Sequence, residues 1–276
     1  MPTLKQLLVG TMFGRWLSTA RDFFSLVRAP RVALGTTVND QLAPRLLAQL
    51  CRPNDVFVDV GAHIGSVIAE VRHNCPSARI VAFEAMPDKV AWLTRKFPTA
   101  TVHCCALSDQ TGEAEFFVNL SQSGYSSLAE QQGSVRRIKV DRKRMDDLLD
   151  WADLIKIDVE GAELGVLRGA VKLIEKCQPL IMFESGPHDV LGFTKEGMFN
   201  FFSERNYGLL APNRLAHRSS VMTLDSFLDG HEYPRRTTNY FAVPMTRLDE
   251  FRMRAASLSH RKPSRNVALE AASVTI

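Results

Sequence analysis

The chain alternates short apolar runs with amphipathic segments from about residue 55 to residue 245. The runs at 56–60, 80–84, 101–106, 154–157 and 179–184 are almost continuously apolar, which is typical of parallel strands that are covered on both faces. Helical spacing is present between them, at 90–96, 164–174 and 194–205. Two further runs near Tyr207 and Tyr240 predict the last strands, and Glu113 begins a predicted hairpin. We therefore expect an α/β fold with a mostly parallel seven-stranded sheet and helices on both faces.

Two polar segments flank this central domain, which we place at residues 55–245. Residues 1–54 are basic, with apolar side chains between the charges, and predict a helical extension. It either packs on the domain or a partner, or lies on an anionic membrane surface as an interfacial helix. No run is long enough to cross a bilayer, and a secretory signal fits poorly because Arg15 interrupts the apolar stretch. Residues 246–276 predict a short helix and then a disordered tail.

Charge and cysteine content narrow the function classes. The net charge of +4 is too small to indicate nucleic-acid binding, and no zinc-finger or RNA-binding motif is present. The five cysteines form no CxxC pair, so we expect a reduced, cytoplasmic protein rather than a disulfide framework.

The segment VFVDVGAHIG, residues 56–65, predicts a buried strand that turns through glycines into a helix. Gly61 would let the backbone approach a ligand closely, and Gly65 would let the helix pack near the strand. A dinucleotide site would place a pyrophosphate at this turn, where Asp59 would repel it, and His63 stands in place of the second glycine. S-adenosylmethionine (SAM) carries an ammonium and a sulfonium without a phosphate, so it suits this turn better.

Two further strands of the predicted sheet end in acidic residues. Glu84 lies about twenty residues after the first turn, where nucleotide sites of this kind place an acid against ribose hydroxyls. Asp158 and Glu160 follow the strand at 154–157. Because the carboxyl ends of parallel strands share one edge of the sheet, Asp59, Glu84 and Asp158 should converge on one crevice.

These motifs, taken in order, resemble the FkbM family of SAM-dependent methyltransferases. The resemblance rests on VFVDVGAHIG, VAFEAMPDKVAWL, CALSDQTGEAEFF, YSSL, LIKIDVEGAELGVLRGA and PLIMFE, and it covers residues 55–186. It implies a class I Rossmann-like methyltransferase fold with an antiparallel last strand. It also implies an enzyme that acts on a hydroxyl of a saccharide, glycoconjugate or secondary metabolite. Two departures are His63, where the family usually has Asn, and Ala85-Met86. Together with the resemblance, the residue pattern gives a candidate cofactor pocket of Asp59, Gly61, Ala62, His63, Gly65, Glu84, Ala85, Ala106, Leu107 and Asp158, and Asp109 is a further candidate.

An alcohol acceptor needs a base or a metal, because it is a weak nucleophile. The candidate base is His188, in the turn after the fifth strand, where a neutral imidazole could accept a hydroxyl proton. Glu184 is the second candidate, orienting either His188 or the acceptor, and Asp158 faces the methionine end of SAM or the acceptor hydroxyl. Asp158, Glu160 and Glu184 could instead bind a divalent cation, although their spacing does not demand one, and no metal is assigned.

The acceptor is a small molecule or a glycan of unidentified structure. The YSSL segment, residues 125–128, is a candidate border of its site, with an ordinary polar turn as the alternative. A basic run at 136–144 is either a solvated face or a site for an anionic acceptor. Two other functions stay open: an NAD-dependent oxidoreductase, and a non-catalytic SAM-binding or membrane-peripheral module.

Overall fold

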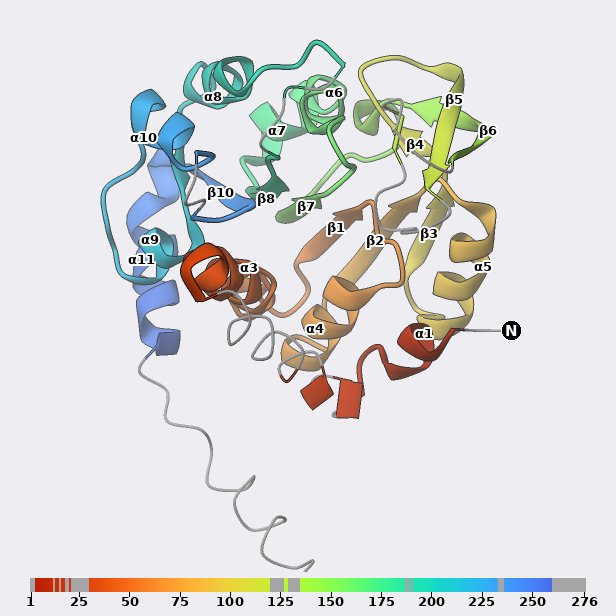
Figure 1. Ribbon diagram of the computed structural model, residues 1–276, viewed down its shortest axis with the longest axis horizontal. Coiled ribbons are helices and arrows are strands. Elements are labelled where there is room, and N and C mark those ends of the chain that lie inside the picture. The colour runs from red at the N-terminus through yellow and green to blue at the C-terminus, as the bar shows by residue number, and fades with distance from the viewer. Residues whose placement is uncertain are drawn as a thin grey trace, which may run out of the picture.

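The computed structural model of the protein describes residues 3–11, 13–14, 16–17, 20, 30–119, 127–128, 135–186, 189, 191–232 and 236–259. A seven-stranded sheet forms its centre, in the order β3-β2-β1-β7-β8-β10-β9 (Figure 1). Its strands are β1 (Val56–Val60), β2 (Arg79–Glu84), β3 (Thr101–Cys104), β7 (Leu154–Ile157), β8 (Leu180–Glu184), β9 (Tyr207–Leu210) and β10 (Asn239–Pro244).

The sheet confirms the expected α/β fold and its strand directions. Neighbouring strands from β3 to β8 pair in parallel, whereas β10 runs antiparallel to both β8 and β9. The last strand of the chain is thus inserted between two earlier ones. The carboxyl ends of β2, β1, β7 and β8 therefore meet at one edge, which is where open parallel sheets bind ligands.

Alternation along the strands assigns helices to both faces of the sheet. Phe57 of β1 packs with α3 (Pro30–Leu50), α4 (Ser66–Asn74), α5 (Pro87–Lys96), α9 (Pro212–Ala216) and α11 (Leu248–Ser259). Val56, Val58 and Val60 point the other way, toward α6 (Glu163–Arg168), α7 (Val171–Cys177), α8 (Lys195–Ser203) and α10 (Leu224–Asp229). The strand residues are apolar on both sides because each side is buried.

The helix pattern at 164–174 is divided in the structure, whereas the sequence predicts one continuous stretch. The break follows Gly169, where a Cβ atom would lie 2.0 Å from the carbonyl oxygen of Ser108. The backbone at Gly169 passes so close to the loop at Ser108 that only glycine fits there. The next helix, α7, begins at Val171.

A second, three-stranded sheet stands beside the main one. It consists of β4 (Ala106–Leu107), β6 (Val135–Lys143) and β5 (Gly112–Asn119), in that order. The predicted hairpin element at Glu113 is β5, which pairs antiparallel with β6. Its apolar face, including Phe116 and Val118, packs over Ala85 and Met86 at the end of β2.

The flanking helices share the core of the central domain. Leu46, Leu47 and Leu50 of α3 are buried among the sheet residues, and so are Phe251 and Ala255 of α11. Both helices lie outside the boundaries predicted at residues 54 and 245, yet they cover the sheet. The other described helical elements are α1 (Leu4–Leu8), η2 (Met145–Asp147) and η3 (Met245–Arg247). Among the described residues, no helix combines the length and apolar character that a bilayer-crossing segment requires.

Candidate functional site

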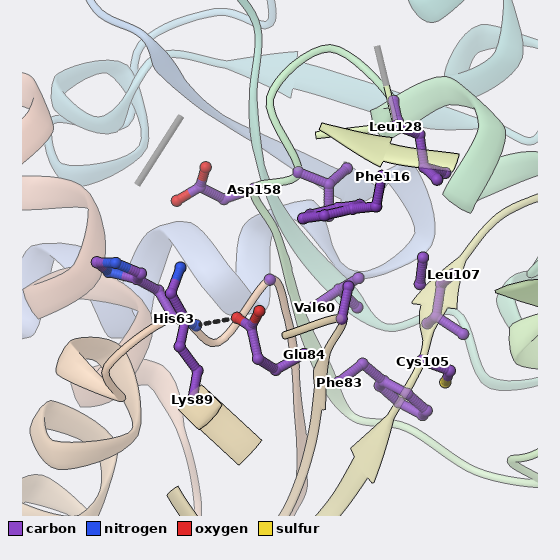
Figure 2. A pocket seen from close by; sticks show the side chains of 15 residues that line it. Val60, His63, Phe83, Glu84, Lys89, Cys105, Leu107, Phe116, Leu128 and Asp158 are labelled. Atoms are coloured by element: carbon purple, nitrogen blue, oxygen red, sulfur yellow. Dashed lines mark hydrogen bonds between the residues drawn. The ribbon is translucent and has the colours of Figure 1, made fainter. Parts of the chain in front are cut away.

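A hollow opens at the carboxyl ends of β1, β2 and β7, the edge predicted from the sequence. It encloses about 540 Å³ of empty volume, including open solvent at its mouth. Figure 2 shows polar side chains, among them His63, Glu84 and Asp158, on one side of the hollow and apolar side chains on the other. The complete lining comprises Val60, Gly61, His63, Phe83, Glu84, Ala85, Lys89, Cys105, Ala106, Leu107, Phe116, Leu128, Asp158, Val159 and Ala162.

Glu84, at the end of β2, connects two loops that border the hollow. Its Oε2 accepts a hydrogen bond from the backbone N–H of His63 at 2.8 Å (Figure 2), and its Oε1 accepts one from that of Met86 at 3.0 Å. Burial raises the pKa of Glu84, while the Lys89 ammonium and the two N–H donors act in the opposite direction. Each carboxylate oxygen keeps a lone pair for a further donor, so Glu84 can still bind hydroxyl groups of a ligand.

The turn after β1 has the backbone geometry that the glycines were expected to supply. Gly61 and Gly65 have positive φ values of 74° and 83°. A Cβ atom on Gly61 would lie 1.9 Å from the carbonyl oxygen of Asp158, and one on Gly65 would lie 2.3 Å from the ring of Phe97. The first glycine therefore permits contact between the β1 and β7 turns, and the second permits helix packing.

Lys156 is a buried charge that sequence reasoning missed. The residue is only 4% exposed, and its Nζ donates a 2.8 Å hydrogen bond to the carbonyl oxygen of Gly61. The same ammonium lies 3.2 Å from Asp59 Oδ1 and 3.4 Å from Asp158 Oδ2. Burial alone would lower its pKa, but the two carboxylates outweigh burial and raise it. The available signal was a lysine inside the apolar run LIKI, because lysine is almost never buried without a partner.

Asp59 forms this ion pair instead of lining the hollow, and its contact with a cofactor stays a prediction. Asp59 is 1% exposed and is absent from the lining of the hollow. It lies in the strand that carries the turn, and the Lys156 ammonium compensates its charge. Asp59 therefore lies behind the lining of the hollow, where its ion pair with Lys156 connects β1 to β7.

Three carboxyl groups gather beside the hollow at the ends of β7 and β8. One oxygen each from Asp158, Glu160 and Glu184 lies within 4.8 Å of the others, a spacing that could also hold a divalent cation. Burial and the neighbouring acids raise the pKa of Glu184 to about 10 and that of Glu160 to about 8. Burial would also raise the pKa of Asp158, but Lys156 and a hydrogen bond from Glu184 lower it. At neutral pH, Asp158 is thus the ionised member, and protonated Glu184 donates to it.

The turn that carries Asp158 is fixed by the first residue of α6. Glu163 is buried, and its carboxylate accepts hydrogen bonds from the backbone N–H groups of Val159 and Gly161. Burial raises the pKa of Glu163 to about 7, against the effect of these donors. Ser127 Oγ donates a 2.7 Å hydrogen bond to the carbonyl oxygen of Glu160 from the opposite side. The turn is thus connected to both its own helix and the small sheet.

The apolar side of the hollow is supplied by the small sheet and β2. Leu107, Phe116 and Leu128 surround it there with Phe83 and Cys105 (Figure 2). Leu107 was a candidate cofactor residue and Leu128 ends the YSSL segment, but the position of Phe116 was not predicted, because the hairpin had no sequence signal that places it over the sheet edge. A planar apolar ring would fit such a lining.

Most of the candidate cofactor residues are brought together. Those that line the hollow are Gly61, His63, Glu84, Ala85, Ala106, Leu107 and Asp158, whereas Asp59, Ala62 and Gly65 support the turn from outside the lining. Whether these residues contact a cofactor stays a prediction. Asp109 lies apart from this hollow and accepts a hydrogen bond from Ser108 Oγ.

The predicted acceptor-site residues lie partly outside the described residues and partly at the hollow or on an exposed face. His188, the candidate base, lies outside the described residues, as do residues 125 and 126 of the YSSL segment. Leu128, the last residue of that segment, lines the hollow. In the basic run, Arg137 and Lys139 lie 3.7 and 3.0 Å from the carboxylates of Glu115 and Glu113, and all four side chains are exposed. These cross-strand pairs favour the interpretation as a solvated face.

Comparison with known proteins identifies related sequences. A family model described as the methyltransferase FkbM domain matches residues 59–209. Methyltransferase sdnD of Sordaria araneosa is 28% identical over 156 residues, which cover 42% of this chain and 60% of that protein. The 2-O-methyltransferase NoeI of Sinorhizobium fredii is 25% identical over 180 residues, covering 56% and 71%. Hexuronic acid methyltransferase AglP of Haloferax volcanii is 27% identical over 147 residues, covering 50% and 59%.

The chain spans about three fifths of the length of the sdnD and AglP relatives. The matched region begins at Asp59, near the end of β1, and includes the turn after β1 together with β2, β7 and β8.

Proposed function

The chain belongs to the FkbM methyltransferase family, and we propose that it transfers a methyl group from SAM to a hydroxyl of a saccharide, glycoconjugate or secondary metabolite. The observation that carries the proposal is the two-sided lining of the hollow. The carboxylates of Glu84 and Asp158 stand on one side with His63 and Lys89, and apolar side chains stand on the other (Figure 2). SAM has the same division, since its sulfonium and ammonium lie at one end and its adenine at the other.

The residues that line the hollow fit SAM at three places. The adenine would lie between Leu107, Phe116 and Leu128, which offer apolar surface to a flat ring. The ribose hydroxyls would donate to Glu84, whose oxygens already accept from two backbone N–H groups. The cationic methionine end would face Asp158, whose side chain is 42% exposed and carries a charge at neutral pH. A pyrophosphate in the same position would be repelled by both acids.

SAM supplies an electrophilic methyl group when bound; the protein's own residues align the acceptor and receive its proton. The Asp158 carboxylate would accept a hydrogen bond from the acceptor hydroxyl and take its proton as that oxygen is methylated. Glu184 keeps its own proton and donates a hydrogen bond to Asp158, which holds the carboxylate in place. Lys156 holds Asp158 as well, through the 3.4 Å ion pair to Asp158 Oδ2. Positioned proton transfer of this kind contributes a rate factor on the order of 10²–10⁴.

The names of two relatives support the acceptor class. One relative is a 2-O-methyltransferase and another is a hexuronic acid methyltransferase. Both names favour a hydroxyl or a sugar as the acceptor over an amine or a nucleic acid. The carboxyl cluster at the polar side of the hollow agrees with this, because carboxylates are good acceptors for sugar hydroxyls.

Calorimetric titration tests the cofactor. We expect SAM and S-adenosylhomocysteine to bind in the micromolar range, about −8 kcal/mol, and NAD to give no measurable heat. Tight NAD binding together with absent SAM binding would refute the proposal and favour an oxidoreductase.

Transfer itself is tested with methyl-labelled SAM and a panel of sugars and glycosides, followed by mass analysis of the products. In the variant Asp158→Asn we expect turnover to fall on the order of a hundredfold or more, and SAM binding to weaken as well, because the same carboxylate faces the cationic methionine end of SAM. His188→Ala is the comparison, because His188 is the other candidate base. If only His188→Ala lost turnover, the base would be His188 and our assignment to Asp158 would be wrong.

A further inference from the structure

The first seventeen residues expose an unusual concentration of large apolar side chains. Of the nine such side chains that are exposed in the described part of the chain, four belong to Leu4, Leu7, Phe13 and Trp16. They are between 53% and 72% exposed, and the rings of Phe13 and Trp16 stack with centroids 6.0 Å apart. We refer to these four side chains as the N-terminal apolar surface.

This surface is presented by a segment that is attached to the domain. Thr3 begins α1 with a capping box, in which Thr3 and Gln6 exchange hydrogen bonds between side chain and backbone. Val9, after the helix, is buried and belongs to the main core cluster. A Cβ atom on Gly10 would lie 3.2 Å from the Cβ of Ala69 on α4, so the backbone passes close to that helix (Figure 1). The contact at Val9 and Gly10 leaves the four apolar side chains facing outward.

The charge of the same segment indicates what covers the surface. The first thirty residues contain four basic residues, Lys5, Arg15, Arg21 and Arg28, against the single acid Asp22. Leucine and aromatic side chains combined with basic residues are the composition of segments that lie in the membrane interface. The four side chains expose on the order of 500 Å², whereas a stable protein interface needs roughly 800 Å² from each partner.

We propose that the N-terminal apolar surface docks on an anionic lipid bilayer, with the aromatic rings in the headgroup region. The basic residues of the segment supply the attraction to anionic headgroups. The proposed contact is an interfacial one, in which the segment lies in the plane of the headgroups. Docking is independent of the methyl-transfer proposal, so either can fail alone.

Flotation of the full chain with lipid vesicles tests the proposal. We expect binding to phosphatidylcholine vesicles that contain about 30% phosphatidylserine, little binding to pure phosphatidylcholine, and a decline as salt screens the charges. The variant Phe13→Ser/Trp16→Ser should bind at least about tenfold more weakly, because it removes the two aromatic anchors. Its matched control is Val38→Ser/Met253→Ser, which removes two apolar side chains of similar exposure from α3 and α11 and should bind as the parent does.

Tryptophan emission provides a second measurement on the same proteins. Trp16 should shift to shorter wavelength when anionic vesicles are added, and the single variant Trp16→Ser should lose that shift. Unchanged flotation of Phe13→Ser/Trp16→Ser would overturn the proposal, and so would absent binding of the parent at low salt. A dimer that this variant abolishes, without any vesicle binding, would identify the surface as a contact between copies of the chain.

Discussion

Replacement of Lys156 by methionine tests the buried ion pair on which the polar side of the hollow rests. Methionine keeps a long side chain in the same space but removes the ammonium. Asp59, 1% exposed, would then be a buried carboxylate without a compensating charge, whereas Asp158 could still turn to solvent because its side chain is 42% exposed. The carbonyl oxygen of Gly61 would also lose its 2.8 Å donor.

The magnitude follows from these losses. Removing one partner of a buried ion pair typically costs about 3–5 kcal/mol of unfolding free energy. Burial already raises the pKa of Asp59, and loss of Lys156 would raise it further. Such a carboxyl stays protonated in the folded state at a pH where the unfolded chain has released the proton. The loss of unfolding free energy in Lys156→Met, relative to the parent protein, should therefore grow above about pH 4. It should grow by up to about 1.4 kcal/mol per pH unit until Asp59 ionises in the folded protein.

Urea unfolding at pH 5 and pH 8 is the assay. We expect Lys156→Met to be destabilised at both and more so at pH 8, and the double variant Asp59→Asn/Lys156→Met to recover part of the loss. Lys139→Met is the control, because Lys139 forms an exposed pair with Glu113 and should cost less than about 1 kcal/mol. If Lys156→Met cost no more than this control, or if the double variant showed no coupling, our account of the ion pair would be refuted.

Three further outcomes are expected. Glu84→Gln should weaken SAM binding about tenfold or more in calorimetry, because its amide turns a donor toward one of two backbone N–H groups and removes a charged acceptor. Gly61→Ala should lower the free energy of unfolding by about 1–3 kcal/mol, because its Cβ would overlap the carbonyl oxygen of Asp158, whereas Gly186→Ala, with no atom within 4 Å, should change it little. The pKa of Glu184, raised to about 10, makes folding bind a proton that the unfolded chain releases above about pH 4.5, so stability falls as pH rises through this window. Glu184→Gln should flatten that decline in urea titrations between pH 5 and 8, and an unchanged slope would contradict the shift.

The linear pattern of the chain determined the architecture of the sheet and the edge that carries the site. Continuous apolar runs indicated strands covered on both faces. The positions of Glu84 and Asp158 at strand ends predicted that they share one site, and both line the hollow. The glycine turn was predictable because positive φ and close backbone approach are properties of glycine itself. The apolar run near Tyr240 predicted a strand there, whereas its antiparallel direction was expected from the resemblance to class I methyltransferases.

Only the tertiary structure determined the partner, the burial and the protonation state of each acidic side chain. Asp59 and Glu84 look alike in sequence, as acids at strand ends, but Asp59 is buried against Lys156 while Glu84 lines the hollow. Likewise, which of Asp158 and Glu184 holds a proton at neutral pH depends on burial and on the distance between two strands. These strands are neighbours in the sheet but not in the chain. A side chain's residue type limits its chemistry, but its pKa and its partner depend on which distant residues the fold packs against it.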